Sequence, residues 1–132
     1  TNQKLHAITL SNGGGGYELV NLFAKVDTHQ DGLHYPEAIG EPREANDEWI
    51  VRAMERCDVV VVGWGDGSGA GIGAVARKSG VRRRAREVWA LVRVGRPQCF
   101  KRNASGSPGH PLYLKNVSTL SRYAPTPEYL AG

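Results

Sequence analysis

The stretch Arg56-Cys57-Asp58-Val59-Val60-Val61-Val62-Gly63-Trp64-Gly65 decides the fold that this sequence predicts. Four consecutive valines between Asp58 and Gly63 indicate a strand without a polar face, because β-branched side chains suit a pleated sheet better than a helix. A strand that is apolar on both faces is typical of a parallel sheet covered by helices. We therefore predict an α/β fold: a three-layer sandwich with a small, mainly parallel central sheet and helices on both faces.

Trp64 and a glycine-rich stretch follow this predicted strand directly. In open α/β sheets, ligands bind in the crevice beyond the carboxyl ends of the strands, so we expect the functional site here. The stretch 69–74 fits the dinucleotide pattern G-x-G-x-x-A only in outline, and the nearest following acid, Glu87, falls inside a predicted helix. We therefore predict a site that takes no nicotinamide or flavin cofactor.

The length and composition exclude several classes of protein. A chain of 132 residues suffices for one domain with its own core, and we expect a single domain over residues 1–132 with a frayed tail from about 118 onward. No apolar run approaches the roughly 18–20 residues that span a bilayer, and the first residues hold no secretory signal. We therefore expect a cytoplasmic protein that does not bind membranes.

The cysteines and histidines do not indicate a metal site. Cys57 and Cys99 flank predicted strands, and we interpret both as reduced core residues rather than as a disulfide. No Cys/His cluster has zinc spacing, and the spacing of His29 and His34 in a predicted loop is nonspecific. We predict neither a metal nor a cofactor.

The net charge of +4 hides a strong asymmetry along the chain. Residues 27–58 hold nine acidic side chains against three basic ones, whereas residues 77–132 hold twelve basic side chains against two acidic ones. A cationic half of this kind is either a solvated helix face or a surface with affinity for phosphates. The second interpretation points to a nucleotide or a nucleic acid as partner.

Shorter patterns predict the elements on the amino-terminal side. We expect a helix over 2–11, a turn at the following glycines, a strand over 17–23 and a long connection over 24–44. Asn46 then has the character of an N-cap, because acidic residues fill the next turn. The core face of this second helix is predicted to hold Trp49, Ile50, Ala53, Met54 and Cys57.

The carboxyl-terminal half is predicted from similar patterns. A helix that begins near residue 73 is interrupted near Gly80, and a stronger helix runs over 81–94 before Pro97. A short strand is expected over 98–102, followed by a loop over 103–109 and a tail with little structure.

Several motifs occur in a definite order along the chain. They are Asn21-Leu22-Phe23-Ala24 with Thr28 and Leu33 downstream, Asn46-Asp47, the stretch from Val59 to Gly65, and Gly106-Ser107-Pro108-Gly109-His110-Pro111-Leu112-Tyr113. In order and spacing they resemble the bacterial family known as domain of unknown function 1643, over about residues 1–115. Family members begin with a further segment that holds an apolar strand ending in an Asn-Pro-Ser motif, and that strand is absent here.

The family pattern is in turn similar to the uracil-DNA-glycosylase-like superfamily. This similarity implies a parallel four-stranded sheet between helices, with Asn21 and His110 facing one crevice. In such glycosylases a polar group activates water, while a histidine stabilises the charge that leaves on the base. The similarity concerns the order of motifs, and a shared fold does not establish a shared function.

We predict the site residues from the motifs, the charge pattern and the family resemblance together. His110 precedes a proline that fixes its direction, and it acts either as a donor to a base or as a cap on a loop carbonyl. A hydrolytic enzyme also needs a general base, for which Asp47, Asp66 and Glu18 are candidates. Our predicted catalytic residues are His110 and Asp47. The predicted ligand-binding residues are Asn21, Thr28, Asn46, Trp64, Gly65, Gly67 and Tyr113, and the predicted phosphate-binding residues are Arg82, Arg83 and Arg84.

Three of these residues can also be explained by a structural role. Asn21 is either a structural bridge or a ligand contact, Trp64 either stacks on a base or packs internally, and Tyr113 is more typical of a core.

Two functional hypotheses remain. The first is a nucleotide- or nucleic-acid-base-binding protein of glycosylase-like fold, with hydrolysis left open. The alternative is a non-catalytic, homo-oligomeric interaction module with a basic surface, in which a homodimer covers the sheet edge left open by the absent strand.

Overall fold

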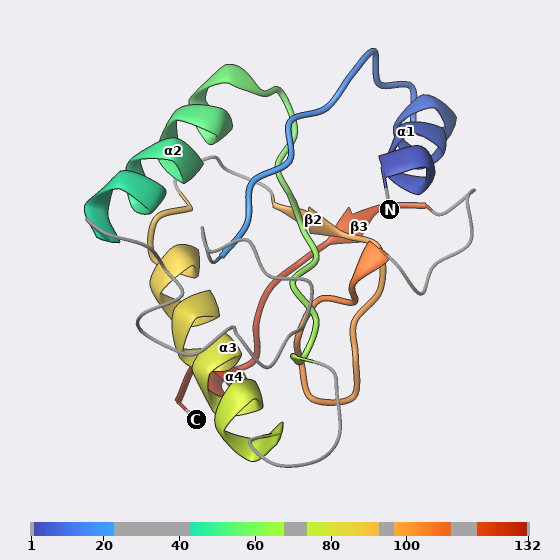
Figure 1. Ribbon diagram of the computed structural model, residues 1–132. Helices are drawn as coiled ribbons and strands as arrows, with labels where there is room; N and C mark the ends of the chain where they lie inside the picture. The colour runs from blue at the N-terminus through green and yellow to red at the C-terminus, as the bar shows by residue number, and fades with distance from the viewer. Residues whose placement is uncertain (1, 23–42, 68–73, 93–96, 112–118, 132) are drawn as a thin grey trace.

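Helices and short strands make up the computed structural model, which describes residues 2–22, 43–67, 74–92, 97–111 and 119–131 (Figure 1). The elements are α1 (Asn2–Ser11), α2 (Arg43–Arg56), β1 (Val61–Val62), α3 (Ala74–Trp89), β2 (Gln98–Cys99), β3 (Ser121–Arg122) and α4 (Pro127–Ala131). The strands form one sheet in the order β1-β2-β3. The fold is therefore mixed α/β, as predicted.

The sheet itself differs from the prediction of a mainly parallel one. β1 pairs with β2 in parallel, with Val61 opposite Gln98, whereas β2 pairs with β3 in antiparallel fashion, with Cys99 opposite Ser121. Among the described residues the sheet is thus mixed. The antiparallel strand comes from the carboxyl-terminal tail, for which the sequence predicts no strand.

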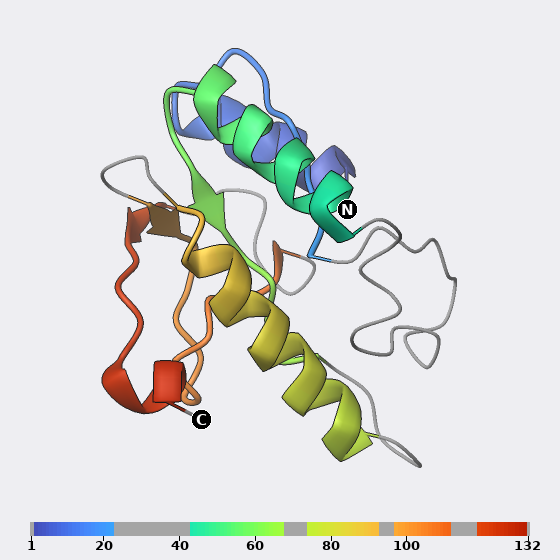
Figure 2. The same cartoon turned by 90° about the vertical axis from the view of Figure 1, so that its left-hand side faces the viewer.

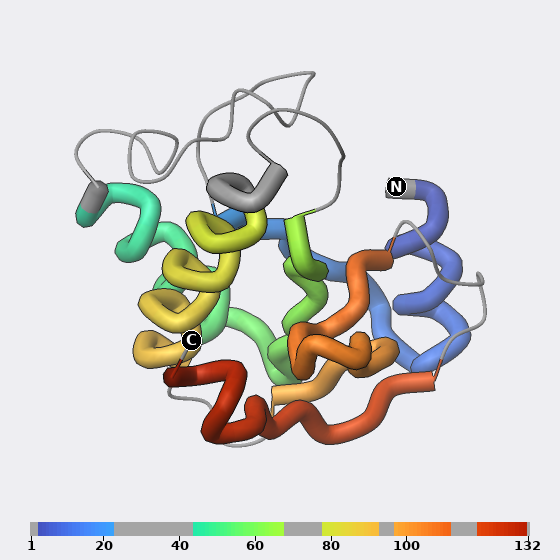
Figure 3. Tube along the Cα trace, turned by 90° about the horizontal axis from the view of Figure 1, so that it is seen from below, coloured from blue at the N-terminus to red at the C-terminus, as the bar shows by residue number. Residues whose placement is uncertain are grey.

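Within the described residues, two apolar clusters pack these elements together. Ile50 and Met54 of α2 pack with Val88 of α3 in one cluster, and Val62 of β1 packs with Cys99 and Tyr123 in the other. Figures 1 and 3 show α2 and α3 next to each other, and α1 on the far side of the strands from them. The view in Figure 2 shows the length of α3 and the carboxyl-terminal segment that runs beside it.

The valine strand is shorter and more exposed than its sequence suggests. Only Val61 and Val62 form ladder pairs, and Val62 is buried whereas Val61 is 38% exposed and Val59 is 52% exposed. The prediction that both faces of this strand are buried is therefore wrong for the face that carries Val59 and Val61. Successive side chains of a strand point to opposite faces, so Val62 packs with Cys99 and Tyr123 on one face of β1 while Val59 and Val61 stay open to solvent on the other.

The segment 17–22 is extended but forms no strand, contrary to the prediction. Its carbonyl groups accept hydrogen bonds from side chains instead of from a neighbouring strand. Asn46 Nδ2 donates to the carbonyl oxygen of Leu22 at 2.9 Å, and Arg84 Nε donates to the same oxygen at 2.8 Å. A strand needs a ladder partner, and alternating side chains alone do not provide one.

Helix α2 begins earlier than predicted and buries a narrower face. It starts at Arg43, so Asn46 lies inside the helix rather than at its N-cap, and Cys57 lies just beyond its end. Ile50, Ala53 and Met54 are buried as predicted, but Trp49 is 59% exposed. The prediction that Trp49 is a core residue is wrong, because α3 packs on the side of α2 that Ile50 and Met54 present.

The remaining elements also differ in extent. Helix α3 runs without interruption through Gly80 and ends at Trp89, about one turn before the predicted end. The tail expected to fray carries β3 and α4 instead, with Tyr123 and Tyr129 buried. The connection predicted over 24–44 lies almost entirely outside the described residues. None of the described helices is long and apolar enough to cross a membrane.

The two neighbouring residues Trp49 and Ile50 provide a test of which face α2 buries. Truncating Ile50 to alanine leaves a cavity against Met54 and Val88, so we expect Ile50→Ala to lower the free energy of unfolding by about 3 kcal/mol. Trp49→Ala removes an exposed ring over which Arg52 lies at 5.9 Å, and we expect a loss within about 1 kcal/mol. Urea unfolding of both variants measures the difference, and equal losses would contradict the observed packing.

Candidate functional site

The carboxyl end of β1 is joined closely to the loop that carries His110. The backbone N–H of Gly65 donates to the carbonyl oxygen of Pro108 at 2.9 Å. Gly65 has a φ of +70°, and a Cβ added to it would lie 3.3 Å from the Cβ of His110. A Cβ on Gly63 would likewise lie 3.2 Å from the carbonyl oxygen of Gly109. The two segments approach this closely because these positions have no side chain.

Asp66 fixes the same loop through its carboxylate. Oδ1 accepts hydrogen bonds from Ser105 Oγ at 2.5 Å and from Ser107 Oγ at 2.6 Å, and Oδ2 accepts one from Asn103 Nδ2 at 3.1 Å. Burial alone would raise the pKa of Asp66, but these three hydrogen bonds outweigh it and hold the pKa below its usual value. Asp66 is therefore ionised at neutral pH and connects the end of β1 to residues 103–107.

His110 lies in the same loop, and it is half-buried beside Gly65. Burial lowers the pKa of the imidazole below its ordinary value of 6.5, because the charged form loses its water. At neutral pH the ring is thus mostly neutral, with one nitrogen that donates and one that accepts. Such a ring can act as a hydrogen-bond donor to a carbonyl group of a ligand without bringing a positive charge.

A second group of predicted site residues lies around the end of the segment 17–22. Asn46 donates to the carbonyl oxygens of Asn21 and Leu22, at 3.3 and 2.9 Å. Arg84 is fully buried, and its Nη2 lies 2.6 Å from Oδ1 of Asp47 in an ion pair. Nη1 of Arg84 is also buried and has no hydrogen-bond partner among the described residues. The side chains of Asn46 and Arg84 thus hold the segment 17–22 in place.

The two groups flank the stretch that follows β1. Figures 1 and 3 show the blue segment that ends at residue 22, the green stretch after β1 and the orange segment that ends at residue 111 next to one another, in this order. The segment 17–22, which Asn46 holds, therefore lies on one side of the stretch after β1, and the segment that ends at residue 111 lies on the other.

The structure does not bring all of the predicted residues together. Trp64 packs internally, because its Nε1 donates to the hydroxyl of Tyr129 at 2.9 Å and its ring meets Tyr123 edge-on. The three arginines point to different places: Arg84 is buried, Arg83 is exposed, and Arg82 lies over the ring of Tyr129 at 5.2 Å. Gly67 has a φ of +75°, and Thr28 and Tyr113 lie outside the described residues.

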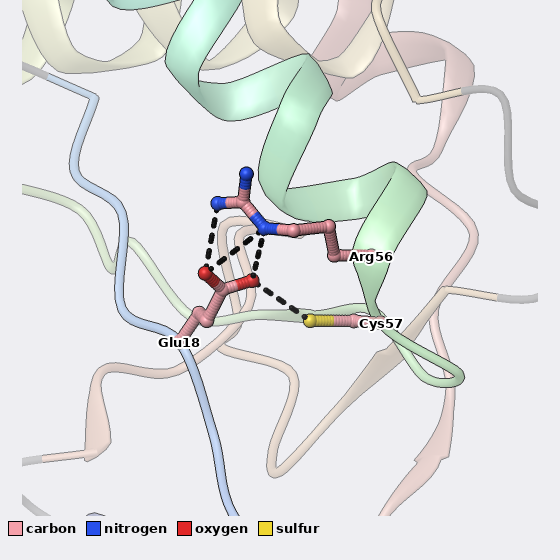
Figure 4. Close-up of polar contacts among 3 residues, drawn as sticks. All are labelled: Glu18, Arg56 and Cys57. Atoms are coloured by element: carbon pink, nitrogen blue, oxygen red, sulfur yellow. Dashed lines mark hydrogen bonds and ion pairs between the residues drawn. The ribbon is translucent and has the colours of Figure 1, made fainter.

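Glu18, a candidate general base, is bound to the end of α2 (Figure 4). Arg56 Nη2 donates to Oε1 of Glu18 at 2.8 Å, and the thiol of Cys57 lies 3.4 Å from Oε2. The hydrogen bonds from Arg56 and, secondly, from Cys57 lower the pKa of Glu18. Burial and, secondly, the hydrogen bond to the Glu18 carboxylate raise the pKa of Cys57, so the thiol stays protonated at neutral pH.

Sequence reasoning missed how the site is held. It identified Asp66 only as a candidate base, although Asn103, Ser105 and Ser107 are polar residues close to the motif that carries His110. It missed Tyr123 and Tyr129 entirely, and the only available signal was that a tyrosine in an apolar setting needs a partner for its hydroxyl. No group of three His, Cys, Asp or Glu side chains in the described residues is arranged to hold a metal ion.

The carboxylate of Asp66 makes the stability of this site depend on pH. Its lowered pKa stabilises the fold above the pKa of the unfolded chain, near 3.9, and this contribution is lost as the pH falls through the folded-state value. We expect Asp66→Asn to lower the free energy of unfolding by about 1 kcal/mol at pH 7 and to flatten the decline below about pH 4.

Urea unfolding between about pH 2.5 and 7 measures both effects. Asp58→Asn is the matched control, because Asp58 is an exposed aspartate beyond the end of α2, and we expect a change within about 0.5 kcal/mol. If Asp66→Asn shows the same stability and pH profile as the wild type, the carboxylate does not fix the loop.

Three comparisons relate this chain to known proteins. Neither a search of the curated proteins nor a search of the solved structures found a match. A family model described as "Protein of unknown function (DUF1643)" matches residues 1–112, which include both groups of site residues. The match ends before the carboxyl-terminal segment that carries β3 and α4. The chain belongs to the DUF1643 family of proteins of unknown function.

Proposed function

We propose that this protein binds a nucleobase, as such or within a nucleotide or nucleic acid, in the crevice beyond the carboxyl end of β1. One observation carries the proposal: Gly65 and Asp66 hold the His110 loop against the end of β1 and leave a half-buried, neutral imidazole there. Nucleobases present carbonyl and ring-nitrogen acceptors, to which a neutral imidazole donates without the cost of desolvating a charge.

Binding is better supported than hydrolysis. Each candidate general base among the described residues already has a structural partner: Asp66 accepts from Asn103 and two serines, Glu18 pairs with Arg56, and Asp47 pairs with Arg84. Asp66 and Glu18 are weak bases for water, because taking up a proton would cost each carboxylate the hydrogen bonds that lower its pKa. Asp47 is the ion-pair partner of the buried Arg84. The proposal is therefore a binding protein, with the three-layer, glycosylase-like arrangement that the sequence predicts as its framework.

Basic side chains near the proposed site favour a ligand that carries phosphate. Arg83, on α3, and Lys101, beside Gly109, are both exposed. Arg82 lies close enough to Asp66 to help lower its pKa. Phosphates attract such side chains in a salt-dependent manner, so we propose a nucleotide or a nucleic acid in preference to a free base.

A thermal-shift screen against nucleobases, nucleosides, nucleotides and short oligonucleotides tests the proposal. We expect one of these classes to raise the melting temperature, and at about 100 times Kd the stabilisation amounts to about 2.7 kcal/mol. His110→Ala should abolish this shift. His6→Ala, which changes an exposed histidine on α1, is the matched control and should leave the shift unchanged.

The outcomes separate a base pocket from a merely basic surface. Oligonucleotide binding that weakens with salt but persists in His110→Ala would show a cationic surface only and would contradict the pocket. The absence of any shift in the wild type would reject the proposed function as a whole.

A second candidate function is self-association into a homodimer. The exposed side chains of Val59 and Val61 lie at β1, which has a free edge among the described residues, and Leu19 and Val20 of the neighbouring segment are also exposed. A free edge strand can pair with the same edge of a second copy about a twofold axis. These exposed apolar side chains favour a second copy of this chain as the partner.

Light scattering at increasing protein concentration tests self-association. We expect the mass to rise from 14.3 kDa toward twice that value, and Val61→Lys to keep it at 14.3 kDa because a charge at the edge opposes pairing. Leu10→Lys, at an exposed apolar position of α1, is the control that should still associate. A wild-type mass of 14.3 kDa at every concentration would exclude the homodimer.

A further inference from the structure

The carboxyl-terminal segment, residues 119–131, packs against the back of the candidate site. It lies outside the residues that match the family, yet it holds Tyr123 and Tyr129, which are 1% and 2% exposed. Figures 2 and 3 show this segment, in red, running beside the orange loop that carries His110. Both tyrosines contact the parts of the chain that form the site.

Tyr123 supports the His110 loop directly. Its hydroxyl donates to the carbonyl oxygen of Gly106 at 2.9 Å, in a fully buried hydrogen bond. Burial, as the largest cause, strongly raises the pKa of this hydroxyl, so it remains a donor at all ordinary pH values. Gly106 lies four residues before His110 and has a φ of +94°, so its carbonyl orientation sets the direction in which the loop continues.

Tyr129 contacts both sides of the site. A Cβ added to Gly106 would lie 3.3 Å from the Cβ of Tyr129, so the tyrosine backs the turn without a gap. Its hydroxyl accepts the hydrogen bond from Trp64 Nε1 at 2.9 Å, one residue before Gly65. The same ring thus fixes the end of β1 and the turn of the His110 loop relative to each other.

Arginines from the rest of the chain hold this segment in place. Arg82 lies over the Tyr129 ring at 5.2 Å, and Arg86 Nη1 donates to the carbonyl oxygen of Leu130 at 3.2 Å, both from α3. Arg102 lies over the Tyr123 ring at 5.5 Å and donates to the carbonyl oxygen of Ala124 at 2.7 Å. Cationic side chains of the predicted basic surface are therefore used to hold the segment.

We propose that Tyr123 and Tyr129 are positioning residues of the candidate site, and that the carboxyl-terminal segment sets the placement of His110 against β1. The inference rests on the proposed function in one respect, since it takes the His110 loop as the working part of the site. It assigns a role to a segment that the family match does not include. It also gives Trp64 a positioning role, through Tyr129, in place of stacking on a ligand.

The test uses Tyr123→Phe and Tyr129→Phe in the full chain, because each removes one hydroxyl and keeps the buried ring. The first readout is the pKa of His110, measured by NMR titration without any ligand. We expect it to rise toward 6.5 in both variants, since a displaced loop exposes the imidazole to water. The second readout is ligand-induced stabilisation in the screen described above, which we expect to fall at least several-fold in affinity.

Two controls separate positioning from a general loss of stability. Ile50→Ala destabilises the other apolar cluster and should leave the His110 pKa unchanged. Leu130→Ala shortens a half-exposed side chain of the same segment, keeps the carbonyl that binds Arg86, and should also leave it unchanged. A His110 pKa that moves with Ile50→Ala as much as with the tyrosine variants would overturn the proposal.

The two proposals can fail separately. If both tyrosine variants melt at a lower temperature but keep the wild-type His110 pKa, the tyrosines only stabilise the fold and the inference is rejected. If the His110 pKa moves as expected but no compound binds the wild type, the positioning role stands and the proposed function fails.

Discussion

The guanidinium of Arg84 connects three parts of the chain that are far apart in sequence. It belongs to α3, pairs with Asp47 of α2, and donates to the carbonyl oxygen of Leu22. A fully buried charge is tolerated only when it is paired and hydrogen-bonded, because its desolvation costs several kcal/mol. The relative placement of α2, α3 and the segment 17–22 is therefore constrained by one side chain, and the first apolar cluster forms within that constraint.

Polar side chains have this role throughout the described part of the molecule. The strands are two residues long, so ladder hydrogen bonds contribute little to holding the segments together. Asn46, Asp66 and Arg102 make the connections that a longer sheet would make through its backbone. The carboxylates of Asp47 and Asp66 make connections of the same kind, with Arg84 and with Ser107.

Local patterns in the sequence located α1, α2, α3, β1 and β2, but they missed β3 and α4 and predicted a strand over 17–23 that does not form over its described residues. Apolar spacing identified α1, α2 and α3, but it could not decide whether Trp49 or only Ile50 faces the core, since adjacent residues lie about 100° apart on a helix. The alternating pattern of residues 17–22 and the four valines predicted strands. Whether such segments pair depends on neighbours that local sequence does not supply.

Only part of the candidate site could be predicted, because its residues come from segments that lie far apart in the sequence. The glycines after β1 and the motif around His110 indicated two segments that the structure brings together, because close approach of two backbones requires residues without side chains. The grouping of Asp66 with Ser105 and Ser107, and of Trp64 with Tyr129, joins positions separated by 39 to 65 residues. No local pattern encodes such pairs, so they emerged only from the three-dimensional structure.

These long separations also determine when during synthesis the site can form. Contacts between residues distant in sequence carry a loop-closure cost and form slowly. The pairing of Trp64 with Tyr129 requires residue 129 to have left the ribosome, whereas α2 and the segment 17–22 can associate much earlier. The emerging chain therefore lacks the contacts of Tyr123 and Tyr129 with the end of β1 and with Gly106 until residue 129 has been made.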